Sequence, residues 1–268
     1  MNAVIPRLIN HGTTGYVNAI LHMLFHITPF REEVARITAT AAERHGDDIA
    51  LELHFIFAKM CSFSRTPVST IGLLRSFGWG ERDQFCPHDA HEFQLTLWSA
   101  LSRRNESGNE RIGTMIRDLF EGTIQYTNVS QHTGSSGLRE LQVKTCKQRF
   151  YSIYAKPGNY NSCDIITAIK ESCAPECLCG DVLRTRFSSF TSLPSILQIR
   201  LTQQDFDFSE FKIKKHGLHC ALPLHVDMAE FVDKAASDGE EKKEGSLELD
   251  CKYTLHSVIV HHGPKGTV

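Results

Sequence analysis

A short polar segment near the N-terminus contains residue types that could support nucleophilic catalysis. Asn10 and the run Gly12-Thr13-Thr14-Gly15 directly precede a stretch with the apolar spacing of an amphipathic helix. The apolar positions of this stretch are Val17, Ile20, Leu21, Leu24 and Phe25. The start of a helix presents unpaired N–H groups and the positive end of the helix dipole, which acidify a thiol and stabilise an anion. Gly15 stands at that start, so the residues alone indicate a capped helix without a nucleophile.

A second candidate segment runs from Asp83 to Phe93 and opens another amphipathic stretch. Its apolar positions are Phe93, Leu97, Trp98 and Leu101. Asp89 precedes this stretch, where the dipole of a helix stabilises a carboxylate. From the spacing alone, Asp89 is therefore interpreted as an acid at the start of a helix.

Other cysteine and histidine residues are weaker candidates for a catalytic or metal site. Cys86 and His88 are close in sequence, but the proline between them and the onset of a helix argue against a dyad. His261 and His262 are adjacent, so in a strand they face opposite sides. The remaining candidates for a metal site are Cys146, Cys163, Cys173, Cys177 and Cys179. They contain no C-x-x-C pair, so we expect small thiols, no metal and no cofactor.

The composition limits the classes of partner and compartment. The chain has 268 residues, 41% hydrophobic and 22% charged, with a net charge of -2, which argues against nucleic acid and anionic membranes as partners. No signal-peptide core or membrane-spanning apolar run is present. Nine cysteines in such a chain indicate reduced thiols. We therefore expect a cytoplasmic or nuclear protein, or one found in both compartments.

The elements that would position the candidate residues are mostly helices first and strands later. We expect helices at 17–25, 29–34, 49–60, 68–77, 93–101, 112–120 and 164–171. We expect strands at 120–126, 150–154, 193–201 and 253–263, and loops at 39–48 and 128–137. The segment 233–250 is a charged insertion without apolar periodicity, which predicts a solvated loop.

The two candidate segments resemble motifs of the ubiquitin-specific protease family, the ubiquitin carboxyl-terminal hydrolases. The first is similar to the cysteine box G-L-x-N-x-G-x-T-C-Y-x-N-x-x-L-Q, matched here by Leu8, Asn10, Gly12, Thr14, Tyr16, Asn18 and Leu21. The second is similar to Q-x-D-A-x-E-F, matched by His88, Asp89, Ala90, Glu92 and Phe93. The segments Val68-Ser69-Thr70 and Ser76-Phe77-Gly78-Trp79 resemble the herpesvirus-associated branch.

The resemblance implies a fold and a division of the chain. It covers residues 7–268 and implies the α+β, papain-like right-hand fold of cysteine proteases. A helical thumb would occupy about 7–110, and fingers and palm strands about 111–220. The segment 221–268 would form an incomplete palm containing the insertion 233–250, because the family's G-H-Y box with the catalytic His does not appear before Val268.

The resemblance also implies roles for individual residues. Asn10 stands at the oxyanion-hole position and Gly15 at the nucleophile position, where the family has Cys. Asp89, Glu92 and His88 stand in the box that contacts the ubiquitin tail. We therefore expect a catalytically inactive protein that binds ubiquitin or its C-terminal tail. The alternatives left open are an altered or partial form of an active thiol-dependent deubiquitinase, and a fragment without function.

Overall fold

The computed structural model describes residues 7–37, 48–62, 66–79, 89–102, 110–133, 139–155, 162–178, 184–201, 204–207, 211–215, 219–233 and 251–261. The chain divides into two compact units. The first comprises residues 1–117 with 259–262 and 267–268, and the second comprises 118–258 with 263–266. The first is helical and the second is built mainly of strands, so the predicted α+β class is confirmed. The predicted thumb, fingers and palm boundaries remain a prediction.

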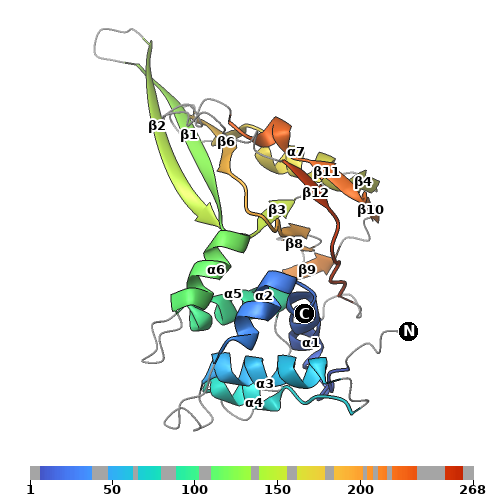
Figure 1. Ribbon diagram of the computed structural model, residues 1–268. Helices are drawn as coiled ribbons and strands as arrows, with labels where there is room; N and C mark the ends of the chain where they lie inside the picture. The colour runs from blue at the N-terminus through green and yellow to red at the C-terminus, as the bar shows by residue number, and fades with distance from the viewer. Residues whose placement is uncertain are drawn as a thin grey trace. The chain divides into compact units, whose positions relative to one another are not determined.

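The first unit is made of amphipathic helices (Figure 1). These are α1 (Gly15–Phe25), α2 (Thr28–Ala35), α3 (Ile49–Cys61), α4 (Ile71–Ser76), α5 (Ala90–Leu101) and most of α6 (Glu110–Phe120), whose last residues belong to the second unit. All five apolar positions predicted for α1 are buried, and so are the four predicted for α5. Phe30 lies at the centre of this core, with ring contacts to Phe57 and Trp98. The 3.6-residue periodicity therefore identified the core faces correctly.

The helix expected at 68–77 begins later than predicted. Val68 instead forms an isolated parallel bridge with Leu8, in which the Ile9 N–H donates to the Val68 carbonyl at 2.9 Å. The Val68 N–H donates to the Arg7 carbonyl, also at 2.9 Å. These backbone bonds hold Val68 in an extended segment, so α4 starts at Ile71.

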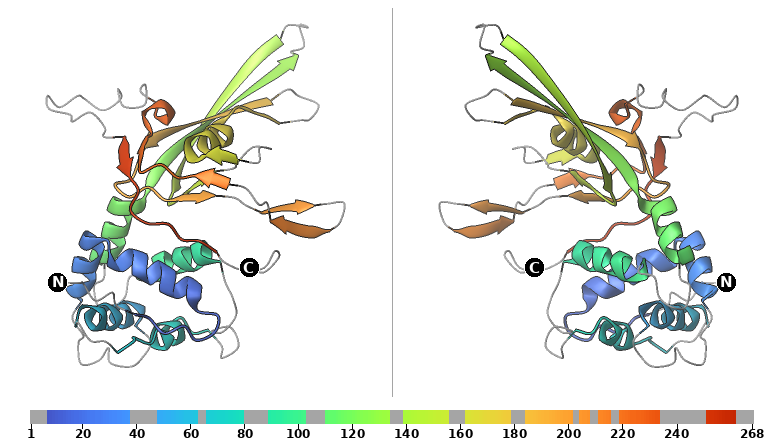
Figure 2. Two further views of the ribbon diagram at one scale, coloured as in Figure 1. Left: turned by 90° about the vertical axis from the view of Figure 1, so that its right-hand side faces the viewer. Right: turned by 90° about the vertical axis from the view of Figure 1, so that its left-hand side faces the viewer.

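The second unit contains a four-stranded sheet in the order β2-β1-β6-β5. Its strands are β1 (Gly122–Thr133), β2 (Arg139–Phe150), β5 (Glu176–Leu178) and β6 (Arg184–Ser192), all paired antiparallel. Figure 2 shows β1 and β2 as a long twisted hairpin. The prediction of a loop at 128–137 is wrong for Asn128–Thr133, because these residues continue β1 and pair with β2 as far as Thr133. These backbone bonds override the turn preference of the Ser- and Asn-rich sequence.

Short strand pairs complete the second unit. β3 (Ile153–Ala155) pairs parallel with β7 (Ile199–Leu201), and β4 (Ser162–Asp164) pairs parallel with β10 (His219–Ala221). β8 (Gln204–Asp207) pairs antiparallel with β9 (Lys212–Lys215), and β11 (His225–Asp227) with β12 (Lys252–Thr254). Helix α7 (Ile165–Cys173) and the 3₁₀ turn η2 (Ala229–Phe231) pack on a core that includes Ile165, Phe190 and Phe231.

Two predicted strands are shorter than expected. Of residues 193–201 only Ile199–Leu201 are strand; the Ile196 N–H donates to the Leu119 carbonyl instead of to a neighbouring strand. Of residues 253–261, the part of the predicted strand 253–263 that the structure describes, only Tyr253 and Thr254 in β12 are strand, and those beyond Leu255 have no strand pairing. Alternating apolar residues alone do not form a strand without a partner edge that takes the backbone bonds.

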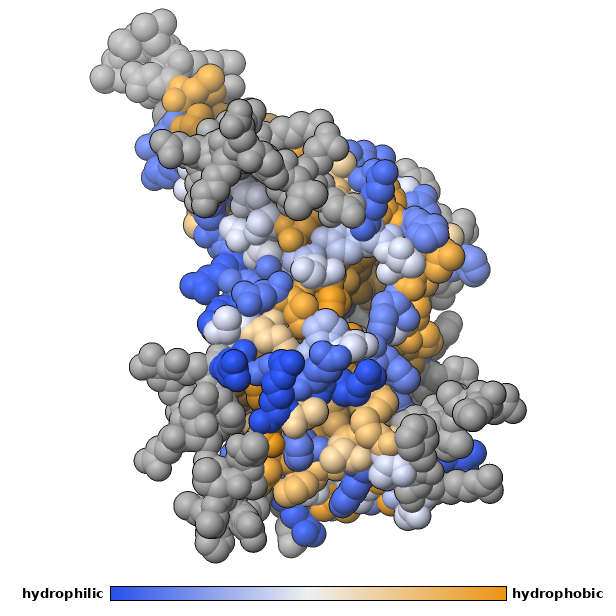
Figure 3. Space-filling model, viewed as in Figure 1, coloured by the Kyte–Doolittle hydropathy of each residue, from blue (hydrophilic) through white to orange (hydrophobic). Residues whose placement is uncertain are grey.

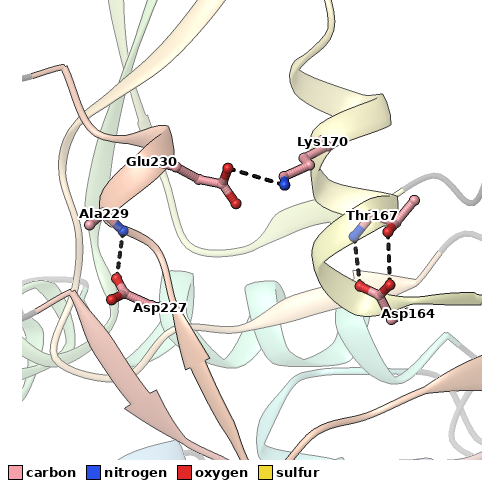
Figure 4. A network of polar contacts seen from close by, with 6 residues as sticks. All are labelled: Asp164, Thr167, Lys170, Asp227, Ala229 and Glu230. Carbon is pink, nitrogen blue, oxygen red and sulfur yellow. Dashed lines mark hydrogen bonds and ion pairs between the residues drawn. The ribbon is translucent and has the colours of Figure 1, made fainter.

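Polar side chains fix the ends of α7 and η2 (Figure 4). The Asp164 carboxylate accepts hydrogen bonds from the Thr167 N–H and from its hydroxyl, both at 2.8 Å. The Lys170 ammonium lies 3.1 Å from the Glu230 carboxylate, which links α7 to η2. The Asp227 carboxylate accepts from the Ala229 N–H at 2.9 Å. Each contact satisfies a backbone donor or a charge at an element terminus.

The Asp164 cap predicts a pH effect on stability. The hydrogen bonds from the Thr167 N–H and hydroxyl lower the pKa of Asp164 from its usual 3.8. A lowered folded-state pKa means that this stabilisation is present above about pH 4 and is lost as the pH falls through the folded-state pKa. Asp164→Asn keeps a cap of similar strength without the charge. We expect its Tm deficit, roughly 1–3 °C near pH 7, to disappear in acid. Thermal unfolding of both proteins from pH 7 to pH 2 tests this, and a deficit that is the same at every pH would contradict it.

Candidate functional site

The segment before α1 is held in place by backbone and amide hydrogen bonds. Besides the bridge to Val68, the Ile9 carbonyl accepts a hydrogen bond from Asn18 Nδ2 at 3.0 Å. Asn18 Oδ1 in turn accepts from the Thr70 hydroxyl at 3.5 Å. Gly12 has a φ of +99°, a left-handed conformation that favours glycine and turns the chain into the helix. The segment is thus tied to α1 on one side and to the residues before α4 on the other.

A chain of hydrogen bonds orients the amide of Asn10. The His11 N–H donates to the Thr14 hydroxyl at 2.9 Å, and that hydroxyl donates to Asn10 Oδ1 at 3.4 Å. With Oδ1 in contact with Thr14, Asn10 Nδ2 is the amide atom that lies near position 15. Thr14 is the N-cap residue of α1, but its side chain makes no capping bond and orients Asn10 instead.

Position 15 has room for a side chain. Gly15 is the first residue of α1, and its φ lies outside the left-handed region. Apart from its own helix backbone and chain neighbours, a Cβ atom built there would meet one atom of the described residues within 4 Å, Asn10 Nδ2 at 3.8 Å, which is ordinary van der Waals contact. Neither the backbone nor the surrounding space therefore requires glycine. A side chain at this position would lie beside an amide donor and the start of a helix.

Asp89 is the N-cap residue of α5. Its Oδ1 accepts hydrogen bonds from the His91 N–H at 2.8 Å and the Glu92 N–H at 3.2 Å, which confirms the interpretation as a helix-start acid. Glu92 lies exposed in the first turn, where the helix dipole stabilises its charge. His88, Cys86 and the rest of 80–88 lie outside the described residues.

Aromatic side chains join the start of α1 to the start of α5. The ring of Tyr16 meets the buried Phe93 edge to face, with centroids 5.5 Å apart. Phe93 also contacts Phe77 at 5.8 Å and Trp79 at 6.4 Å. The starts of α1 and α5 therefore lie side by side within the first unit. Such edge-to-face pairs add to the stability gained from burial alone.

The structure also reveals histidine contacts that the sequence did not indicate. His11 Nε2 lies 3.1 Å from the Ser69 hydroxyl, 58 residues away in the chain. His22, at a position where the family pattern has Gln, is half-buried. Burial and the neighbouring His26 lower the pKa of His22, so it is neutral at pH 7. A sequence separation of this size leaves no local pattern from which the His11–Ser69 contact could be predicted.

The remaining candidates do not assemble into a metal site within the described part of the chain. No group of three His, Cys, Asp or Glu side chains there has the arrangement of a metal site. Cys163 and Cys220 do come together, with their sulfurs 3.7 Å apart. Cys179 and His262 lie outside the described residues, and His261 is exposed. The absence of zinc remains a prediction, which elemental analysis tests.

The second unit contains a pocket of about 480 Å³, lined in part by Lys170, Cys173, Ser188 and Glu230. Lys170 and Glu230 pair with each other across it, so their charges are largely compensated. Burial raises the pKa of Cys173, which keeps that thiol protonated and unreactive near neutral pH. Neither this ion pair nor this thiol is therefore an activated group.

Comparison with known proteins places this arrangement in a family. The family profile described as ubiquitin carboxyl-terminal hydrolase matches residues 6–267. Ubiquitin C-terminal hydrolase 12 of Arabidopsis thaliana is 30% identical over 263 residues, which are 96% of this chain and 22% of that protein. Ubiquitin carboxyl-terminal hydrolase 15 of Schizosaccharomyces pombe is 28% identical over 267 residues, 96% of this chain and 22% of its own length. Ubiquitin carboxyl-terminal hydrolase 7 of Drosophila melanogaster is also 28% identical, with 21% of its length covered.

This chain thus spans about a fifth of the length of these relatives. In the described residues no helix has both the length and the apolar content needed to cross a bilayer. The match over nearly all of the sequence agrees with the mixed helices and sheets described above, as expected for a papain-like fold. The chain is a member of the ubiquitin carboxyl-terminal hydrolase family, with the papain-like α+β fold of that family.

Proposed function

We propose that this chain binds ubiquitin through its C-terminal tail and does not cleave ubiquitin conjugates. The observation that carries the proposal is the environment of Gly15, the first residue of α1, where a Cβ would lie 3.8 Å from Asn10 Nδ2. Thiol-dependent hydrolysis needs a sulfur nucleophile, and glycine supplies none. The donors around that position are present, so the segment keeps polar groups that contact a peptide carbonyl while lacking the atom that attacks it.

Recognition of the ubiquitin tail is assigned to the start of α5. Asp89 is the principal residue, and Glu92 and His88 belong to the same motif. A carboxylate has about four acceptor positions, so the two N–H bonds at Asp89 Oδ1 are compatible with a further bond to a peptide. Charge-assisted bonds of this kind contribute more than neutral ones.

The proposal also covers the branch of the family, the partners and the cellular location. We assign the chain to the herpesvirus-associated branch on the segments Val68-Ser69-Thr70 and Ser76-Phe77-Gly78-Trp79. Ubiquitin or ubiquitinated proteins are its proposed partners, and the cytoplasm, the nucleus or both its proposed location. Neither nucleic acid nor membrane is a partner in this proposal, in keeping with a net charge of -2.

One observation favours a second candidate, an altered or partial form of an active thiol-dependent deubiquitinase. A Cβ at position 15 would be in ordinary van der Waals contact with Asn10 Nδ2, and the Asn10 amide is held by the Thr14 hydroxyl. Sequencing the natural transcript separates the two candidates. A Cys codon at position 15 would favour the enzyme, and a Gly codon would favour the ubiquitin-binding protein.

Replacement of Asp89 tests the binding proposal. In titrations of isotope-labelled ubiquitin followed by NMR, we expect resonances of the ubiquitin tail to shift with wild type. Asp89→Ala is expected to weaken the affinity about tenfold or more, because it removes a charge-assisted contact worth roughly 1.5–3 kcal/mol. It also removes the α5 cap, at a stability cost of about 1 kcal/mol.

The chain offers a matched control at the start of α3. Asp48 Oδ1 accepts from the Ala50 N–H at 2.9 Å and the Leu51 N–H at 3.2 Å, nearly the same geometry as the Asp89 cap. Asp48→Ala should therefore lower the Tm by a similar amount and leave ubiquitin affinity unchanged. Asp89→Asn, which keeps the cap, should still lose affinity. The proposal fails if wild type gives no shifts at high micromolar ubiquitin, or if Asp89→Ala and Asp48→Ala bind equally well.

A further inference from the structure

Two cysteines in the second unit face each other across a pair of parallel strands. In the register of β4 and β10, Cys163 lies directly opposite Cys220. Opposed residues on neighbouring strands place their side chains on the same face of the sheet. The Cys163 thiol donates to the Cys220 sulfur over an Sγ–Sγ distance of 3.7 Å, across 57 residues of chain. Both thiols are half-buried against the hydrophobic core of the second unit.

This geometry meets the main requirement for a covalent link. Neighbouring strands lie about 4.8 Å apart, within the Cα–Cα range of roughly 4.4–6.8 Å that disulfides span. The two sulfurs need to approach by less than about 2 Å to reach bonding distance. Three of the other described cysteines, Cys61, Cys146 and Cys177, are exposed and lie on other elements. We propose that Cys163 and Cys220 are a redox-sensitive pair that a peroxide converts into an intramolecular disulfide joining β4 to β10.

The chemistry proceeds in two balanced steps. The Cys163 sulfur, as thiolate, attacks one oxygen of the peroxide and breaks the O–O bond. This gives a sulfenic acid and a hydroxide (or alkoxide), which takes up the proton released when Cys163 ionised and leaves as water (or an alcohol). The Cys220 sulfur then attacks the sulfenic sulfur, the S–S bond forms, and the hydroxyl leaves as water with the Cys220 proton. The protein loses two electrons and two protons, and the peroxide is reduced.

The environment of Cys220 determines the order of these steps. Burial, together with the neighbouring Cys163 sulfur, raises the pKa of Cys220 to about 11, so its thiol is protonated at neutral pH. Cys220 is therefore a poor first nucleophile, and its proximity to Cys163 makes it the resolving thiol. A leaving thiol with a high pKa also slows reduction of the disulfide once it has formed.

A disulfide here would restrict the unfolded chain. It would close a loop between residues 57 positions apart, and cross-links over loops of this length stabilise proteins mainly by restricting the unfolded ensemble. We expect the oxidised protein to unfold at a Tm roughly 4–10 °C above that of the reduced protein.

Peptide mapping after oxidation tests the proposal. The reduced, full-length protein is treated with hydrogen peroxide, its free thiols are blocked with N-ethylmaleimide, and the digest is analysed by mass spectrometry. We expect a peptide linking Cys163 to Cys220 whose mass is lower by two hydrogen atoms than the sum of the reduced peptides. Cys163→Ser and Cys220→Ser should each abolish the link and the rise in Tm.

Cys177→Ser is the matched control, because Cys177 lies in the same unit but is exposed on β5. This variant should keep both the linked peptide and the rise in Tm. Recovery of Cys163 and Cys220 with separate maleimide labels after oxidation of wild type would overturn the proposal. Linkage of either residue to other cysteines at equal yield, or a rise in Tm that persists in Cys163→Ser, would also overturn it.

Discussion

A Gly15→Cys variant is expected to form a covalent adduct with a ubiquitin derivative carrying a C-terminal electrophile, whereas wild type forms none at this position. The new Cβ would lie in ordinary van der Waals contact with Asn10 Nδ2, so the substitution should not disturb α1. The thiol would lie at the helix start, where the dipole lowers its pKa and increases the fraction of reactive thiolate. We expect labelling at least about tenfold above the wild-type background, measured by the gel shift of the adduct.

Gly15→Ala is the control for this experiment. It fills the same space without a sulfur, so it should fold like the Cys variant and give no adduct. Wild type should likewise release no fluorophore from a ubiquitin amide substrate. An adduct on wild type would contradict the proposal of an inactive protein. The labelled residue would then have to be mapped, beginning with Cys61 and Cys86.

Truncation of Phe93 should have the largest effect on stability. This side chain is 1% exposed and contacts the rings of Tyr16, Phe77 and Trp79. Phe93→Ala would leave a cavity between α1 and α5 and should destabilise the first unit by about 3–5 kcal/mol. The affinity for ubiquitin should fall together with the stability, because the starts of α1 and α5 lose the aromatic contacts that hold them together.

The free energy of unfolding can be measured for the first unit alone. Both tryptophans of the chain, Trp79 and Trp98, belong to that unit, so their fluorescence during urea unfolding reports on it alone. Leu95→Ala is the control, since Leu95 lies on the same helix but is 39% exposed, and it should cost under about 1 kcal/mol. Equal losses of stability in Phe93→Ala and Leu95→Ala would show that the aromatic cluster does not support the site.

The sequence predicted the helical unit well because helix information is local. The apolar faces of α1 and α5 follow from residues within two or three turns of each other, and every predicted core position on them is buried. The relation of Asn10 to position 15 is local in the same way, since Thr14 lies between them and orients the amide.

The errors arose where distant segments decide the structure. Val68 looked helical but is held extended by Arg7 and Ile9, and Asn128–Thr133 looked like a loop but pairs with β2. The His11–Ser69 contact and the Tyr16–Phe93 pair likewise join residues that share no local pattern. Strand ends and long-range contacts depend on partners that periodicity within one segment does not reveal.

The hairpin of β1 and β2 has a consequence for how the protein behaves in concentrated solution. Among the described strands β2 is an edge of its sheet, and Leu141 and Val143 on it are 66% and 59% exposed. Figure 3 shows hydrophobic surface near the end of this hairpin at which β1 ends and β2 begins. An edge of this kind is a template for strand pairing between molecules. Lys144 and Lys147 lie exposed on the same strand, and their like charges oppose such pairing until salt screens them. Self-association should therefore increase with ionic strength, so dilute, low-salt buffers suit this protein best.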